Sequence, residues 1–110
     1  MLDPVLHALA EPRRRDILRL IQEEERPAGD IAARFDVTRP AISQHLKVLM
    51  DAGLVTMRKR GTQRLYQARP EGLAELREFL EGFWDTNLQR LKQAAEAEER
   101  RLKTDDIRSK

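Results

Sequence analysis

The sequence lacks several features that would define other classes of protein. Its 110 residues include no cysteine, which excludes a disulfide framework and thiolate metal sites. No segment approaches the roughly 18 uninterrupted apolar residues of a membrane-spanning helix, and no signal peptide opens the chain. Aromatic residues make up only 5% of the composition. We therefore expect a single cytoplasmic domain with a small core and no membrane partner.

Acidic residues are scarce in one third of the chain. Residues 37–70 contain seven basic residues and one acidic residue, whereas residues 1–36 contain six basic and eight acidic, and residues 71–101 contain five basic and eight acidic. A solvated surface with scattered charge would not concentrate one sign in this way. The basic block predicts a surface that binds nucleic acid.

The pattern of caps and apolar spacing predicts helices on both sides of a β-hairpin. Asp3, Pro12 and Thr38 stand at expected helix starts, and Gly53 suits a left-handed helix end. Two short strand-like runs, 54–57 and 65–68, flank a loop of residues 58–64 that contains glycine, which is typical of a hairpin. The predicted helices span residues 3–10, 12–23, 27–35, 38–52 and 71–101.

This order of elements predicts a mainly α fold with a β-hairpin wing, the winged helix-turn-helix. The third and fourth predicted helices form the helix-turn-helix pair, joined by residues 35–38, and the hairpin is the wing. We expect residues 1–101 to form one DNA-binding and dimerisation domain. Residues 102–110 lack periodicity and are expected to be a flexible tail.

The fourth predicted helix has the two faces that a recognition helix needs. Ile42, Leu46 and Leu49 recur at helical spacing and should pack on the domain. The opposite face carries no acid and offers donors and acceptors suited to base edges or phosphates in the major groove. We expect base contacts from Arg39, Ser43 and Gln44, and phosphate contacts from Thr38 and Lys47. His45 could reach DNA or lie beneath the wing.

The wing carries Arg58, Lys59, Arg60 and Arg64 without an acid. Such a loop suits the minor groove or flanking phosphates. Basic residues also protect an exposed hairpin edge, but four of them exceed that need. The run Arg13-Arg14-Arg15 has two open interpretations, a phosphate site at a helix start or pairing with acids one helical turn away.

The apolar stripe of the last predicted helix is wider than a small domain needs for itself, and the first helix also has an apolar side to spare. Both are best buried against a second copy in a two-fold homodimer. Such a dimer would present two recognition helices about 34–36 Å apart to an inverted repeat. The residues expected at this interface are Val5, Leu6, Leu9, Leu73, Leu76, Phe79, Leu80, Phe83, Trp84, Leu88 and Leu91.

Several of these segments together resemble the ArsR family of winged-helix repressors. The resemblance spans roughly residues 2–92 and is carried by Leu9-Ala10-Glu11-Pro12, by AISQHLKVLMDAGLV, and by the wing that ends in Arg64-Leu65-Tyr66. It implies a homodimeric repressor that dimerises through its first and last helices and binds double-stranded DNA. The contact positions that it implies are Thr38, Arg39, Pro40, Ser43, Gln44, His45 and Lys47, and on the wing Arg58, Lys59, Arg60, Thr62, Gln63, Arg64 and Tyr66.

The sequence departs from the metal-sensing members of that family. Those members place cysteines around the third helix, or acid and histidine ligands on the last helix, and both patterns are missing here. The run RLYQARPEGLAELREFLEGFWDTNLQRL is similar to a metal-independent branch. Members of this branch are often autorepressors encoded beside a small ligand-binding or membrane partner. The resemblance thus implies that no metal and no cofactor is needed.

Two other functions remain open at this point. A metal-responsive repressor could use the carboxylates of Glu78, Glu81 and Asp85, and a winged helix can also serve as a protein-interaction module. An enzyme is not expected, because the sequence has no convincing Ser-His-acid arrangement, no phosphate-binding glycine loop and no set of metal ligands.

Overall fold

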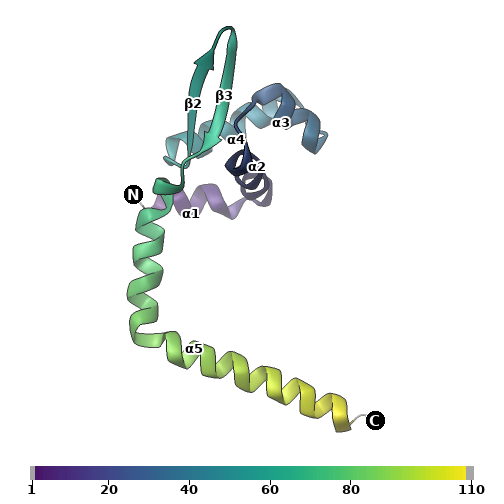
Figure 1. The fold of residues 1–110 in the computed structure, drawn as a ribbon, viewed down its shortest axis with the longest axis vertical. Coiled ribbons are helices and arrows are strands. Elements are labelled where there is room, and N and C mark those ends of the chain that lie inside the picture. Colours follow the sequence, from purple (N-terminus) through teal and green to yellow (C-terminus); the bar gives the residue numbers. More distant parts are fainter. Residues whose placement is uncertain (1, 109–110) are drawn as a thin grey trace. The chain divides into compact units, whose positions relative to one another are not determined.

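The computed structural model describes the backbone of residues 2–108, and it describes the side chains of these residues except 85–89 and 103–108. The chain divides into two units, the first ending at Leu76 and the second starting at Arg77, which are described separately. The elements are α1 (Leu2–Ala10), α2 (Pro12–Glu23), β1 (Arg26–Pro27), α3 (Ala28–Phe35), α4 (Arg39–Asp51), β2 (Val55–Arg60), β3 (Gln63–Ala68), the 3-10 helix η1 (Pro70–Leu73) and α5 (Ala74–Arg108) (Figure 1).

The ends of α4 form as its sequence predicts. The Thr38 hydroxyl accepts a hydrogen bond from the Ala41 N–H at 3.3 Å and caps the first turn. At the other end Gly53 has a φ of 77°. There the Gly53 N–H donates to the Met50 carbonyl, and the Leu54 N–H donates to the Leu49 carbonyl, both at 2.9 Å. These two bonds are those of a Schellman motif, which ends the helix and turns the chain into the wing.

Of the starts of α1, α2 and α3, two differ in detail from the prediction and one agrees with it. Helix α1 begins at Leu2, so Asp3 lies in its first turn and is not its cap. Helix α2 begins at Pro12, as predicted. Helix α3 begins at Ala28 with Pro27 as its N-cap, one residue later than predicted. Each shift is of the size expected where fraying ends leave the first turn weakly specified.

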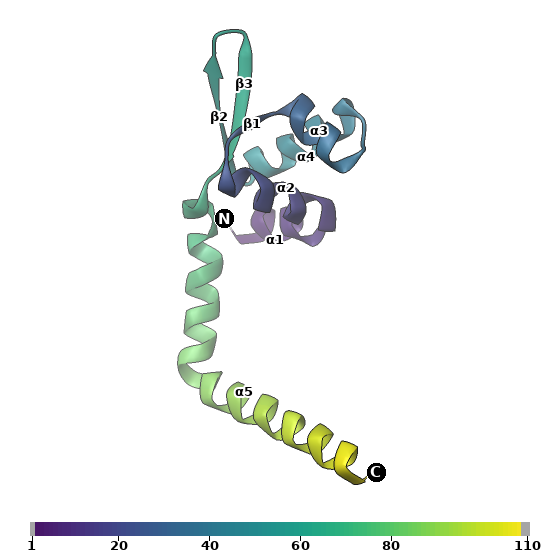
Figure 2. The same ribbon diagram turned by 45° about the vertical axis from the view of Figure 1, so that its right-hand side comes forward.

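The β-sheet has one strand more than the sequence predicted. The hairpin of β2 and β3 is confirmed, but its strands include most of the expected loop, so that only Gly61 and Thr62 form the turn. Residues Arg26 and Pro27 pair with Tyr66 and Leu65 and add β1, which gives the antiparallel order β1-β3-β2. Figure 2 shows β1 beside the lower part of β3, below the projecting end of the hairpin.

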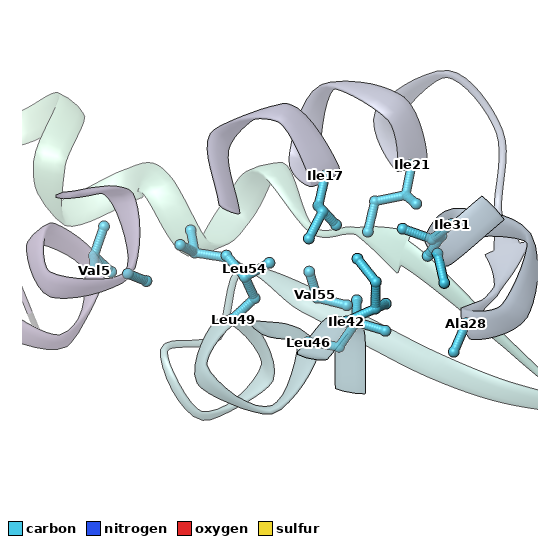
Figure 3. Close-up of a cluster of buried hydrophobic side chains, with 12 residues drawn as sticks. Val5, Ile17, Ile21, Ala28, Ile31, Ile42, Leu46, Leu49, Leu54 and Val55 are labelled. Atoms are coloured by element: carbon cyan, nitrogen blue, oxygen red, sulfur yellow. The ribbon is translucent and has the colours of Figure 1, made fainter. Parts of the chain in front are cut away.

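The core of the first unit joins all four short helices to the start of the wing. Ile17 and Ile21 of α2 meet Ile31 of α3 and the inner face of α4, and Val5 closes one end (Figure 3). Among the described side chains, no polar or charged residue is fully buried. Burial of apolar surface therefore dominates the stability of this unit, at about 1.5–3 kcal/mol for each fully buried large aliphatic side chain.

These elements make up the predicted winged helix-turn-helix. Helices α3 and α4 pack against each other across the short link of residues 36–38, in which Asp36 takes a left-handed conformation with a φ of 52°. The buried side of α4 is Ile42, Leu46 and Leu49, as predicted. The fourth helix is thus anchored on the domain by one face and leaves the other face open.

The second unit is the greater part of α5. The helix continues to Arg108, past the end expected near Arg101. The division of the chain at residues 101 and 102, with a flexible tail, stays a prediction. No helix in the described part of the chain is both long enough and apolar enough to cross a membrane.

Candidate nucleic-acid interface

The open face of α4 carries the residues predicted to contact DNA. Because Ile42, Leu46 and Leu49 are at most 1% exposed, the helix cannot rotate without losing its anchor. Its other face is thereby fixed toward solvent. The exposed residues of that face are Thr38, Arg39, Pro40, Ser43, Gln44 and Lys47.

The wing forms a two-stranded projection with a tight end. Gly61 has a φ of 62°, and Thr62 beside it has no positive φ, which is the pattern of a type II′ turn with glycine in the first central position. The side chains from Arg58 to Arg64 are all exposed. Tyr66 lies lower on β3, is partly buried, and packs against the core.

A cleft of about 510 Å³ joins the wing to the helix-turn-helix pair. It brings Arg39 and Ser43 of α4 together with Arg64 of β3, although β2 separates these elements in the sequence. Its wing residues come from the turn and from β3. The residues that line it are Pro27, Ala28, Gly29, Arg39, Ser43, Thr62, Gln63, Arg64 and Tyr66.

Three of the cleft residues were not predicted from the sequence. Pro27, Ala28 and Gly29 form the start of α3, where the first backbone N–H groups of a helix point outward without an intrahelical partner. The helix start itself was recognisable from Pro27. Its position beside Arg39 and Arg64 was not, because it depends on β1 pairing with β3.

The basic residues of the wing do not all have the same surroundings. Arg64 lines the cleft, whereas Arg58, Lys59 and Arg60 lie on β2, at the sheet edge opposite β1. Arg58 forms an ion pair with Glu25, its Nε lying 2.8 Å from Oε2 while its Nη2 bonds Oε1. This hydrogen bond, together with the charges of Arg58 and Arg60, holds the pKa of the Glu25 carboxyl below its ordinary value, although partial desolvation opposes the shift.

The arginine run at the start of α2 has a structural role that neither interpretation anticipated. The Arg14 Nε donates to the Ala8 carbonyl at 2.7 Å, and the Arg15 guanidinium donates to the Leu9 carbonyl at 2.6 Å. Both bonds satisfy carbonyls in the last turn of α1, where cations are also favoured by the helix dipole. Arg13 lies over the Phe35 ring, 5.1 Å from its centroid.

His45 is partly buried on the side of α4 that faces the start of α2. Desolvation lowers the pKa of His45, and the charges of Arg14 and Arg13 lower it further, whereas Glu11 opposes them. The charges that act on His45 therefore belong to α2 and to its N-cap residue Glu11, and a position of this side chain beneath the wing stays a prediction. A contact of His45 with DNA stays a prediction.

The residues expected at a dimer interface fall into three groups. Leu6, Leu73, Phe79, Phe83 and Leu91 are exposed, with Phe79 at 58%. Leu9, Leu76, Leu80 and Trp84 are partly buried. Val5 is only 2% exposed and belongs to the core of its own chain, which corrects the expectation that it faces a partner. The Leu88 side chain lies outside the described residues.

The carboxylates considered for a metal site lie only in part among the described side chains, so that alternative stays a prediction. Glu81 accepts a hydrogen bond from the Arg77 Nε at 2.7 Å and is paired with it. The Asp85 side chain lies outside the described residues. No group of three or more histidine, cysteine, aspartate or glutamate side chains that could hold a metal ion occurs among the described residues.

The sequence matches known bacterial regulators over the same elements. The family model of the bacterial regulatory protein, arsR family, matches residues 11–57, from the start of α2 into β2. The HTH-type transcriptional regulator Rv2034 of Mycobacterium tuberculosis is 46% identical over 82 residues, which cover 74% of this chain and 77% of that protein. The arsenical resistance operon repressor of Staphylococcus xylosus is 36% identical over 80 residues, covering 73% and 77%.

A solved structure agrees with these matches. The homodimeric winged helix-turn-helix DNA-binding domain of Mb0332 from Mycobacterium bovis superposes with a TM-score of 0.63 at 32% identity, covering 79% of this chain and 81% of that chain. The match in sequence, the winged helix-turn-helix and the basic surface around α4 agree with one another. This chain belongs to the ArsR family of DNA-binding transcriptional regulators and is not an enzyme.

Proposed function

We propose that this regulator is a homodimeric repressor that binds an inverted-repeat operator, with α4 in the major groove and the wing on flanking DNA. The observation that carries the proposal is the cleft in which Arg39 and Ser43 of α4 lie together with Arg64 of the wing. A groove that is open, polar and cationic on both sides fits a DNA backbone that passes between a helix and a hairpin. Repression is supported by the relative from Staphylococcus xylosus, which is named a repressor.

The first two turns of α4 are assigned to base readout. Arg39, Ser43 and Gln44 are exposed there, and their side chains can meet guanine, several bases and adenine, respectively. Thr38 and Lys47 are exposed at the two ends of this surface and are assigned to phosphates. The N–H groups at the start of α3 are added to this set, because they border the same cleft.

The wing is assigned to the minor groove and its phosphates. Arg64 borders the cleft together with Gln63 of β3 and with Thr62 in the turn. Arginine is favoured where the minor groove is narrow, since the negative potential is strongest there. Binding is expected to weaken steeply with salt, because each neutralised phosphate releases counterions.

The dimer is assigned to α1 and α5. Both helices expose large apolar side chains, Leu6 on α1 and Phe79, Phe83 and Leu91 on α5. Contact of these side chains with water is unfavourable in free energy, and burial against a second copy would remove it. The Mycobacterium bovis neighbour is homodimeric, which supports the same assembly here. Sedimentation equilibrium should give a dimer for the unaltered chain and a monomer for Phe79→Glu, and Glu78→Gln serves as a matched control. A monomeric unaltered chain would refute this assignment.

We also assign this chain to the metal-independent branch of the family. Support comes from the sequence, which lacks cysteine altogether and has no histidine after residue 45. A calorimetric titration with zinc should show no tight binding to the protein. Tight binding that also releases DNA would overturn the assignment.

The central experiment is selection of bound DNA from a random pool, followed by titration of the selected sequence. We expect an inverted repeat with half-sites about one helical turn apart. The double variant Arg39→Ala with Gln44→Ala should bind it about 100-fold more weakly, since each bidentate base contact contributes about 1–3 kcal/mol.

A matched double variant on α2 provides the control. Arg19 and Gln22 are exposed on α2, and Arg19→Ala with Gln22→Ala removes the same two residue types from the same unit. This control should bind with unchanged affinity. Equal affinities of the two double variants, with intact folds by circular dichroism, would refute α4 as the reading helix.

A further inference from the structure

One basic residue of the wing, Arg58, forms an ion pair with an acidic residue from a distant part of the chain. Arg58 lies in β2, and Glu25 lies in the turn between α2 and β1, 33 residues earlier. Two guanidinium nitrogens bond two carboxylate oxygens, Nε with Oε2 at 2.8 Å and Nη2 with Oε1. This is the bidentate arrangement in which arginine pairs most strongly with a carboxylate and also with a phosphate.

Arg58 lies on β2, the strand farther from the cleft, whereas Glu25 precedes β1. In the order β1-β3-β2, the strands β1 and β2 occupy opposite edges of β3. The cleft is lined by Pro27 of β1 and by residues of β3 and the turn, which puts β2 on the other edge. Because Arg58 pairs with Leu65 of β3, the bond from Glu25 reaches Arg58 across β3.

The β2 edge offers DNA a positively charged surface that suits phosphates rather than specific base edges. Its exposed residues next to the turn are Arg58, Lys59 and Arg60, whose long cationic side chains attract phosphates of any sequence. Arg39 and Ser43 of α4, which suit base edges, border the cleft on the other side. DNA held at the β2 edge would therefore be bound without sequence preference.

We infer that Glu25 is a specificity-determining residue, which occupies the Arg58 guanidinium and so disfavours the docking of DNA at the β2 edge of the wing. The inference rests on the proposed operator binding through α4. The bidentate bond engages two of the five N–H donors of the guanidinium and compensates its charge, so Arg58 binds a phosphate more weakly while that bond is intact and cannot offer it the same Nε and Nη2 pair. Specificity is a difference between two affinities, and weakening the competing mode raises it as effectively as strengthening the correct one.

The test is a titration of the selected operator and of random-sequence DNA at several salt concentrations, using the full-length protein. Glu25→Gln keeps the size of the side chain and removes its charge. We expect it to bind random DNA on the order of threefold more tightly and to make the slope of log K against log salt more negative by about 0.9, the value of one added phosphate contact. Operator affinity should stay nearly unchanged.

Two controls separate this effect from a general change in charge. Glu24→Gln removes a neighbouring exposed acid that approaches Arg26 at 3.6 Å, and it should leave the salt slope unchanged. Glu25→Gln combined with Arg58→Gln should return random-DNA binding to the unaltered level, because the released guanidinium is gone. Circular dichroism of each variant verifies the fold.

Three results would overturn the inference. An unchanged salt slope in Glu25→Gln would show that Arg58 does not turn to phosphates. Weaker operator binding by both Glu25→Gln and Arg58→Gln would show that the pair instead supports the wing in its correct position. An unaltered protein without preference for the operator would refute the proposed function and this inference together, whereas a selective protein with an unaffected Glu25→Gln would refute this inference alone.

Discussion

Gly72 lies where η1 passes over the end of α4, and its replacement by alanine tests how closely these two segments must approach. An added Cβ would lie 2.1 Å from the Gly53 carbonyl oxygen and 3.2 Å from the Leu54 Cα. Close carbon–oxygen contacts in proteins are about 3.3 Å. Since both neighbours are backbone atoms that end α4, the side chain has no rotamer that avoids them, and η1 would have to move by more than about 1 Å.

The cost follows from what such a movement disturbs. The Arg69 N–H donates to the Leu54 carbonyl at 2.7 Å, and the Gly72 N–H donates to the Arg69 carbonyl at 3.0 Å. Overpacking typically costs about 1–3 kcal/mol, and a weakened hydrogen bond adds about 1 kcal/mol. We expect Gly72→Ala to lower the free energy of unfolding by about 2–4 kcal/mol, which corresponds to a fall in Tm on the order of 10–20 °C.

Urea unfolding followed by circular dichroism at a fixed protomer concentration measures this change. Gly29→Ala is a matched control, because a Cβ at that position would have no atom within 4 Å, and its stability should stay within about 1 kcal/mol of the original. If Gly72→Ala unfolds at the same urea concentration as Gly29→Ala, the close approach of η1 to the end of α4 is not a constraint on this fold.

Two further changes test the ends and the buried side of α4. Thr38→Ala removes the cap bond to Ala41 and should cost about 1 kcal/mol in urea unfolding, whereas Thr38→Ser should retain most of the stability; equal losses would rule out the capping bond as the cause. His45→Gln should remove part of the pH dependence of stability. The pKa of His45 is lowered from 6.5 in the folded chain, so its contribution is complete above pH 6.5 and declines as the pH falls toward the folded pKa. If the free energy of unfolding of His45→Gln changes with pH in parallel with that of the unaltered protein, this expectation is contradicted.

The local parts of the fold were predictable because their causes lie within a few residues. Pro12 starts α2, Thr38 caps α4 and Gly53 ends it, and each uses hydrogen bonds or φ preferences of its own turn. The spacing of Ile42, Leu46 and Leu49 predicted the buried face of α4 for the same reason. The open face, which carries the expected DNA contacts, followed from that spacing, and its role in base readout stays a prediction.

Other features were beyond the reach of local reasoning. The two residues of β1 are too few to show a strand pattern, and they are extended only because β3 pairs with them. Val5 and Leu6 are adjacent apolar residues of one helix, and only packing decided that the first enters the core while the second stays exposed. The cleft likewise exists only when α3, α4 and β3 come together.

The charges show the same division between sequence and structure. The sequence by itself determined that one third of the chain is strongly basic and that α4 has no acid before Asp51. Tertiary structure decided which basic side chains remain available to bind other molecules, since Arg14 and Arg15 cap α1 and Arg58 pairs with Glu25. Helix formation depends on neighbours within about four residues, whereas the pair of Arg58 with Glu25 and the cleft depend on segments that only the folded core holds together.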